Sequence, residues 1–341
     1  MAHELYLING ESSMAYTNET PWHGLGQQIE DGEPIEVWAK KAHLDWNIIE
    51  TPVYFYGENP RTTQRTLFPT NHFRKPVPRK KALIRSDNSD FLSIVGEGYQ
   101  TVQPMEILEF FRDLVATGGF KLSTAGSIFN GLKMWALAET GDPMNIAGDK
   151  VRQFLLLATS CDGTMANTGM FTTTRVVCNN TLSVSLREGE SGRASKYVTM
   201  PHSTKFDAAQ MKQELGLGQQ AFARFAESAN EMTKYRLEDE VVAKLFAHLF
   251  AKKDESGLYI DAAPVKVVSN IINFYKNGVG QDLPSTNGTL WGAVNAVTGY
   301  VDHIRRARSS DSKMNNALFG EGAALKDKMW AMADDMIRKA A

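Results

Sequence analysis

The sequence lacks several features that would assign it to a class at once. It contains only two cysteines, Cys161 and Cys178, in 341 residues, which excludes a disulfide framework and favours a reducing compartment. No apolar run reaches the roughly 18 residues that cross a bilayer. The first ten residues, MAHELYLING, lack the basic and then apolar order of a signal peptide. We therefore expect a soluble cytoplasmic protein that does not enter a membrane.

The motifs of metal, nucleotide and catalytic sites are also missing. The histidines do not occur as HxH, HxxxH or HExxH, and the two cysteines form no closely spaced pair. Neither GxxxxGK[ST] nor GxGxxG after a strand is found. We therefore expect no metal and no cofactor, and we assign no catalytic residue.

The composition is that of a globular protein with a substantial core, because 43% of the residues are hydrophobic and 22% are charged. The hydrophobic periods predict an N-terminal half of mixed elements. We expect helices at 35–42 and 105–116, a strand at 53–56, and a hairpin of strands 82–85 and 91–95. Strands at 121–128, 133–139, 151–159 and 169–173 follow, and then a helix at 174–186.

After residue 206 the periodicity is helical, with helices expected at 211–250, 266–276, 289–308 and 323–339. The prediction is an α+β fold: an antiparallel sheet with a β-β-β-α type core, followed by a mostly helical region. We expect the first domain at 1–206, with a basic arm at 61–85 and the strand-helix core at 120–186. The helical region then spans 207–341.

The basic arm is the strongest local signal, because the net charge of the whole chain is −2 while residues 61–85 contain no acid. Cations neutralise phosphates, and aromatic faces stack on bases. Three prolines exclude a regular helix here, so an extended arm or loop is expected. The alternative is a solvated loop whose charge has no function. The candidate contacts are Arg61, Arg65, Phe68, Phe73, Arg74, Lys75, Arg79, Lys80, Lys81 and Arg85.

The second candidate is the start of the helix expected at 174–186. Its threonines can cap the helix, and Arg175 would add a cation beside the free backbone N–H groups that attract phosphate. Asn179, in the same helix, would either read a ligand or tie the helix to the sheet. The alternative is a plain capped helix with an exposed arginine.

Several strings together resemble one family: PWHGLG at 21–26, RVVCNNTL at 175–182 and NAVTGYVDH at 295–303. The sequence resembles the phage- and plasmid-encoded family catalogued as domain of unknown function 932. That resemblance implies a bacteriophage or prophage setting in a bacterial host cell, and no activity. At fold level the order of elements is similar to the single-strand annealing proteins of the RecT, Redβ and Erf type. This similarity implies single-stranded DNA as partner, a homo-oligomeric ring or helical filament, and no catalytic residues.

Three functional hypotheses follow. The first is a non-catalytic single-stranded DNA-binding and annealing protein used in recombination. The second is an enzyme acting on nucleotides or nucleic acid, with a site near His23, Cys161, Asp162 or Cys178. The third is an oligomeric interaction or counter-defence protein, with exposed side chains at 329–330 as its assembly surface. A basic groove favours the first, a deep pocket joining His23 to a cysteine the second, and a large apolar interface the third.

Overall fold

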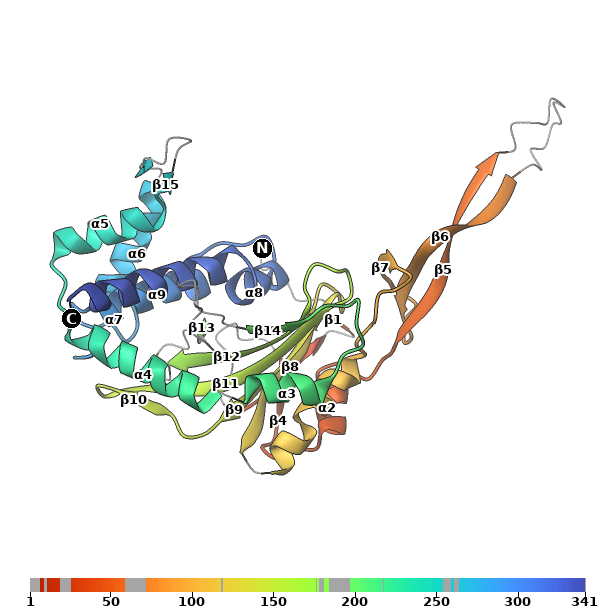
Figure 1. Cartoon of the computed structure of the whole chain (residues 1–341), viewed down its shortest axis with the longest axis horizontal. Helices are drawn as coiled ribbons and strands as arrows, with labels where there is room; N and C mark the ends of the chain where they lie inside the picture. The colour runs from red at the N-terminus through yellow and green to blue at the C-terminus, as the bar shows by residue number, and fades with distance from the viewer. Residues whose placement is uncertain are drawn as a thin grey trace.

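The computed structural model describes residues 7–8, 11–18, 26–58, 72–117, 119–175, 177, 181–183, 197–216, 218–253, 259–260 and 264–340. The fold is α+β, as predicted: a large and mostly antiparallel sheet has helices on both faces, and a helical region makes up the C-terminal part (Figure 1). The division of the chain near residue 206 stays a prediction. In this described part, no helix is both long and apolar enough to span a membrane.

The large sheet has nine strands, with the order β13-β12-β11-β9-β8-β3-β4, while β10 pairs with β11 and β14 with β12. Its one parallel pair in the described residues is β3 with β4. The strands are β3 (Met14–Thr17), β4 (Gln27–Ile29), β8 (Phe120–Ile128), β9 (Lys133–Thr140), β10 (Met144–Ile146), β11 (Asp149–Ser160), β12 (Asn167–Arg175), β13 (Thr181–Ser183) and β14 (Tyr197–Met200). The four strands expected between 121 and 173 are confirmed as β8, β9, β11 and β12. Two short strands, β1 (Leu7–Ile8) and β2 (Glu11–Ser12), pair separately.

Local sequence explains the centre of this sheet. The run at 154–158 is buried throughout, as expected for a strand covered on both faces. The β8–β9 hairpin turns at Asn130 and Gly131, whose φ angles of 56° and 93° suit an Asn-Gly turn. A Cβ on Gly131 would lie 2.6 Å from the Trp46 ring, so only glycine fits this position.

Four helices cover one face of the sheet: α1 (Ile35–Lys41), α2 (Pro104–Ala116), α3 (Ala208–Leu215) and α4 (Gly218–Lys234). The helix α2 starts with a capping box between Gln103 and Glu106 and with a proline in its first turn. On this side of β12, Phe171 meets Phe222 of α4 edge to face. The helices predicted at 35–42 and 105–116 are thereby confirmed as α1 and α2.

The opposite face of the sheet packs against α8 (Ser310–Leu318) and lies near α9 (Glu321–Ala340). Here Trp135, Leu156 and Met170 form a second core with Met314 of α8. The remaining C-terminal elements are α5 (Asp239–Leu249), α6 (Val265–Asn277), α7 (Leu290–Gly299), a π-helical turn η1 (Tyr300–Ile304), and the short strands β15 (Lys252–Lys253) and β16 (Tyr259–Ile260). The long helices predicted at 211–250 and 289–308 are therefore interrupted, and α8 was not predicted.

Two sequence-based expectations are wrong. The helix expected at 174–186 is not formed: β12 continues to Arg175, and β13 pairs back on it through Thr174 and Thr181. The β-branched threonines favour a strand, and pairing with β11 and β13 outweighs the local capping signal. The side chains at 329–330, proposed as an exposed assembly surface, instead pack inward: Met329 is fully buried, and the half-buried Trp330 stacks on Phe225 with ring centroids 4.5 Å apart.

A smaller sheet extends away from the body of the molecule (Figure 1). Its strands are β5 (Ile48–Glu58), β6 (His72–Arg85) and β7 (Phe91–Gly96), in that order. Strand β7 pairs only with the part of β6 nearest the body, from Lys80 onward. The outer part is thus a two-stranded ribbon, made of 53–58 on β5 and 72–79 on β6. The predicted hairpin is confirmed as β6–β7, and the described part of the arm, residues 72–85, is extended, as predicted.

Candidate nucleic-acid interface

The ribbon contains an irregularity that separates its outer part from its base. Pro52 pairs with Lys81, and the next pair is Tyr54 with Pro76. Residues 77–80 of β6 therefore lie opposite Val53 alone. Arg79 takes a left-handed conformation there, with a φ of 58°, and its carbonyl accepts the Glu97 N–H. Prolines are tolerated in β6 because this bulge interrupts the ladder of hydrogen bonds.

Cations and aromatic rings face one another across the outer ribbon. Tyr56 pairs with Arg74, and Phe55 pairs with Lys75. Because side chains alternate along a strand, Tyr54, Tyr56 and Arg74 share one face, whereas Phe55 and Lys75 share the other. The Arg74 guanidinium carbon lies 3.5 Å from the centre of the Tyr54 ring. Both faces of the ribbon thus combine a cation with an aromatic ring.

These rings are unusually accessible for strand residues. The exposed fractions are 39% for Tyr54, 45% for Phe55 and 70% for Tyr56. Large exposed apolar groups that gather in one place mark a binding surface. Arg74, Lys75, Arg79 and Lys80 are exposed on the neighbouring strand, so the ribbon can contact a polyanion and stack on its bases.

The structure brings together only part of the predicted arm. Arg74, Lys75, Arg79 and Lys80 lie on the exposed ribbon. Phe73 belongs to β6, but its side chain lies outside the described part. Arg61, Arg65 and Phe68 lie outside the described residues altogether.

Arg85 is not a nucleic-acid contact, and this prediction is wrong. Its side chain is fully buried where the smaller sheet joins the body. The guanidinium donates to both Asp87 carboxylate oxygens at 3.0 and 2.7 Å, donates to the Asn130 carbonyl at 3.3 Å, and lies 3.9 Å from the centre of the Trp46 ring. The hydrogen bonds from Arg85 hold the pKa of Asp87 below its usual value. Arg85 therefore anchors the ribbon to the body.

Lys81 also has a structural role. Its Nζ donates to the Glu50 carboxylate at 2.7 Å and to the Tyr99 carbonyl at 2.7 Å. Only 15% of its side chain is exposed. This lysine joins β6 to β5 and to the segment after β7, so it is held away from a ligand on the outer ribbon.

Replacing Arg85 with methionine is expected to lower the free energy of unfolding by about 2–3 kcal/mol, because charge-assisted hydrogen bonds to a buried group are lost. Denaturation in urea measures this. The matched control is Arg79→Met, an exposed position whose change is expected within about 0.5 kcal/mol. Since the folded pKa of Asp87 is lowered, the stabilisation is present above the ordinary carboxyl pKa of 3.8 and is lost as pH falls through the folded value. Equal stability of the two variants would contradict the anchoring role.

The second candidate contact is also changed by the structure. Arg175 ends a strand, where its backbone pairs with Val151, so no helix N-terminus receives a phosphate there. The Arg175 side chain and the whole of Asn179 lie outside the described part of the chain. The prediction of a phosphate site at this helix start is therefore wrong, because no helix begins there.

Sequence reasoning missed Tyr54, Phe55 and Tyr56. A strand was predicted at 53–56, and three consecutive aromatic residues were visible in it. The missing information was the pairing partner, because only the register places Phe55 opposite Lys75 and Tyr56 opposite Arg74.

The described residues offer little to a hidden enzyme site. Cys161 is buried, and its Sγ lies 3.5 Å from the Gly131 carbonyl oxygen. Asp162 shapes a turn by accepting from the backbone and side chain of Thr164. Within the described ranges, no three His, Cys, Asp or Glu side chains are grouped to hold a metal ion. His23 and Cys178 lie outside the described residues.

Cys161 is expected to resist alkylation at pH 8 in the folded protein. Burial, with the Asp162 charge as a smaller cause, raises the pKa of its thiol from 9.0 to about 12. The thiolate fraction falls by about a thousandfold, and access falls as well. Iodoacetamide labelling of the Cys178→Ser variant, followed by mass spectrometry, measures this with and without urea. Labelling of the folded variant at the unfolded rate would contradict the prediction.

Comparison with known proteins supports a family and nothing finer. The family model described as Domain of unknown function (DUF932) matches residues 91–319. The match begins at the first residue of β7, so it includes most of the large sheet and excludes the β5–β6 ribbon. No curated protein matches the chain, and no solved structure matches it.

Proposed function

Because the chain belongs to the family Domain of unknown function (DUF932), whose description assigns no activity, we propose a function from the ribbon: the protein binds single-stranded DNA. The observation that carries this proposal is the ribbon's combination of exposed cations on β6 with exposed aromatic rings on β5. The net charge of −2 offers no general attraction, so binding depends on this local surface.

The chemistry of the ribbon favours a single strand over a duplex. Cations hold phosphates and release counterions, whereas tyrosine and phenylalanine rings stack on bases that are not already paired. A ring stacks on any base, so we expect little preference for sequence. Base edges stay accessible when a strand is held by its backbone and by stacking.

The finer proposal is annealing. A strand held with its base edges free can pair with a complementary strand, and this step needs no catalytic residue. One ribbon reaches few nucleotides, so repetition of the subunit along a strand would strengthen binding through multivalency. We therefore propose a homo-oligomer, a ring or a helical filament, that acts in phage or prophage recombination in the cytoplasm of a bacterial cell. The phage setting is what the family resemblance implies. The annealing step and the oligomer are proposed from the chemistry of the ribbon, because the helix that completed the β-β-β-α order of the annealing proteins is not formed.

The test is a titration of the full chain with a labelled single strand of mixed sequence and with its duplex, at low and at physiological salt. Light scattering of the same samples gives particle size. We expect tighter binding to the single strand, weaker binding at higher salt, and growth of the particle with DNA. Absence of binding at low salt would overturn the proposal.

A second assay separates annealing from binding. Complementary strands labelled with a donor and an acceptor fluorophore are mixed with and without protein. Annealing predicts faster energy transfer when protein is present. Binding without acceleration would leave the single-strand proposal standing and remove the annealing function.

A further inference from the structure

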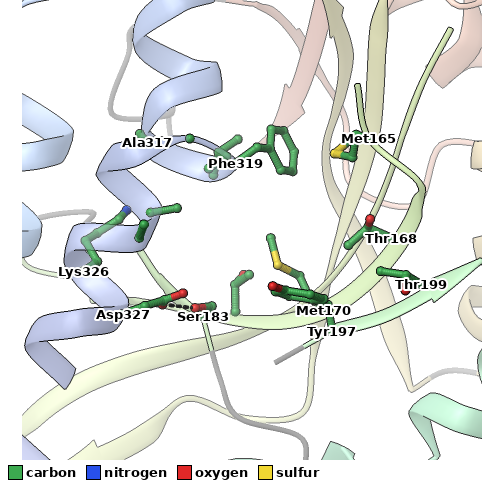
Figure 2. A pocket seen from close by; sticks show the side chains of 15 residues that line it. Met165, Thr168, Met170, Ser183, Tyr197, Thr199, Ala317, Phe319, Lys326 and Asp327 are labelled. Carbon is green, nitrogen blue, oxygen red and sulfur yellow. Dashed lines mark hydrogen bonds between the residues drawn. The ribbon is translucent and has the colours of Figure 1, made fainter. Parts of the chain in front are cut away.

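A cavity of about 290 Å³ lies between the large sheet and the helices α8 and α9 (Figure 2). Strands β12 and β14 form one wall, and the end of α8 with the first turns of α9 forms the other. Its volume is near the lower end of the usual range for ligand pockets, about 300–1,000 Å³. The cavity is remote in sequence from the ribbon, and the proposed function does not use it.

The apolar part of the cavity suits a flat ring. Met165, Met170 and Phe319 surround the same space in Figure 2, and Leu318 lies beside them in the lining. Thioether sulfurs and aromatic rings are polarisable groups that pack well on aromatic faces. Methionine side chains also adjust to rings of different size.

One polar group of the lining has no hydrogen-bond partner among the residues that the structure describes. Because side chains alternate along β12, Thr168, Met170 and Thr172 face α8 and α9. Thr172 is 2% exposed, and its hydroxyl oxygen has no hydrogen-bond partner among the described residues. Such a group costs stability unless something supplies the bond. Rotation about χ1 exchanges the hydroxyl and methyl positions of a threonine, so the hydroxyl can serve a ligand edge.

The charges of the lining disfavour an anion. Lys326 is the one cation of the lining in the described part of the chain, and its Nζ donates to Asp302 at 2.8 Å. Both partners are buried, with 4% and 1% of their side chains exposed. The Asp327 carboxylate also lines the cavity and accepts the Ser183 hydroxyl at 2.6 Å. A phosphate placed inside would meet a neutralised lysine and a carboxylate.

From these three observations we propose that the cavity binds an uncharged, planar heterocycle of the nucleobase type. Its faces contact the methionines and Phe319, and its polar edge bonds to Thr172. A phosphate attached to the ligand stays in solvent. The base can come from a free nucleoside or from a DNA strand, and the experiment separates these sources.

The experiment uses the full chain and calorimetric titration with adenosine, guanosine, cytidine and thymidine, and with their 5′-monophosphates. We expect at least one nucleoside to bind, its monophosphate to bind no more tightly, and inorganic phosphate not to compete. Failure of all four nucleosides at millimolar concentration overturns the proposal, as does tighter binding of the monophosphates.

Variants locate the site. Thr172→Val removes the hydroxyl at constant size and is expected to weaken nucleoside binding about five- to tenfold. Because the hydroxyl is unpaired, this variant should melt at or above the parent temperature. Ala323→Leu reduces the cavity and should abolish binding. The control is Thr174→Val, on the same face of β12 and outside the lining. Equal affinity of parent, Thr172→Val and Ala323→Leu overturns the assignment.

Two oligonucleotides distinguish the sources of the base. If the site accepts a base within a strand, a normal oligonucleotide displaces the nucleoside and an abasic one does not. If neither displaces it, the free nucleoside is the ligand. Removal of the ribbon cations should leave nucleoside binding unchanged, so failure of the ribbon proposal and failure of this one are distinguishable.

Discussion

Replacing Arg74, Lys75, Arg79 and Lys80 together with glutamine is expected to weaken single-strand binding on the order of a hundredfold near 0.1 M salt, because each lost phosphate contact removes counterion release. The same loss should flatten the plot of log affinity against log salt by about 3 units, at roughly 0.7 per contact. Fluorescence anisotropy over a series of salt concentrations measures both quantities.

A matched control has the same change in net charge at scattered positions: Lys41, Lys150, Lys205 and Lys266, all exposed, are replaced with glutamine. This variant should keep most of its affinity and its salt dependence. If both variants lose affinity equally, binding follows overall charge and the ribbon has no special role.

The aromatic rings of the ribbon are expected to contribute to single-strand affinity separately from the cations. The dependence of affinity on salt concentration distinguishes the two contributions. Replacing Tyr54 and Tyr56 with serine removes stacking worth about 1–3 kcal/mol per base and leaves the cations in place. Affinity should therefore fall while the slope against salt stays as in the parent. A changed slope with unchanged affinity at low salt would contradict stacking.

The largest expected loss of stability comes from the buried ion pair of Lys326 and Asp302. Asp302 lies on the π-helical turn η1, and Lys326 reaches it from α9. Lys326→Met removes the cation that bonds to the buried Asp302 carboxylate, which is expected to cost about 3–5 kcal/mol. Denaturation in urea measures the loss as a lower midpoint at similar slope.

The double variant Lys326→Met with Asp302→Leu removes both charges and should recover much of this loss, because a buried pair and apolar groups of similar size are often close in stability. The control is Lys339→Met, whose ion pair with Asp335 is exposed on the same helix; its cost should stay within about 1 kcal/mol. A Lys326→Met cost no larger than the control would contradict the buried pair's role.

Much of the fold followed from local pattern. The apolar run at 154–158 lies within the strand predicted at 151–159, and the Asn130-Gly131 turn joins the strands predicted at 121–128 and 133–139. Both signals act over a few residues, so the sequence alone carries them. The threonine-rich segment after Gly169 misled the prediction, because its capping signal involves neighbouring residues only, whereas its pairing with β11 and β13 is decided by the tertiary structure.

The sequence predicted only one strand of the candidate site, because strand pairing is not encoded by neighbouring residues. The arm contains basic residues and no acid, and its prolines exclude a helix. These two properties predicted a basic and extended segment. The partner of that segment was not determined by its own residues. Pairing of β6 with β5 places Tyr54 and Tyr56 beside Arg74.

The sequence by itself determined an α+β chain with one extended basic arm, because periodicity, proline and charge are properties of neighbouring residues. Only the tertiary structure decided that Arg85 anchors the arm while Arg74 stands exposed on it. The two arginines look alike in the sequence. They differ because Arg85 lies where the small sheet meets the body, where it is buried and donates a hydrogen bond to the carbonyl of Asn130, 45 residues away in the sequence.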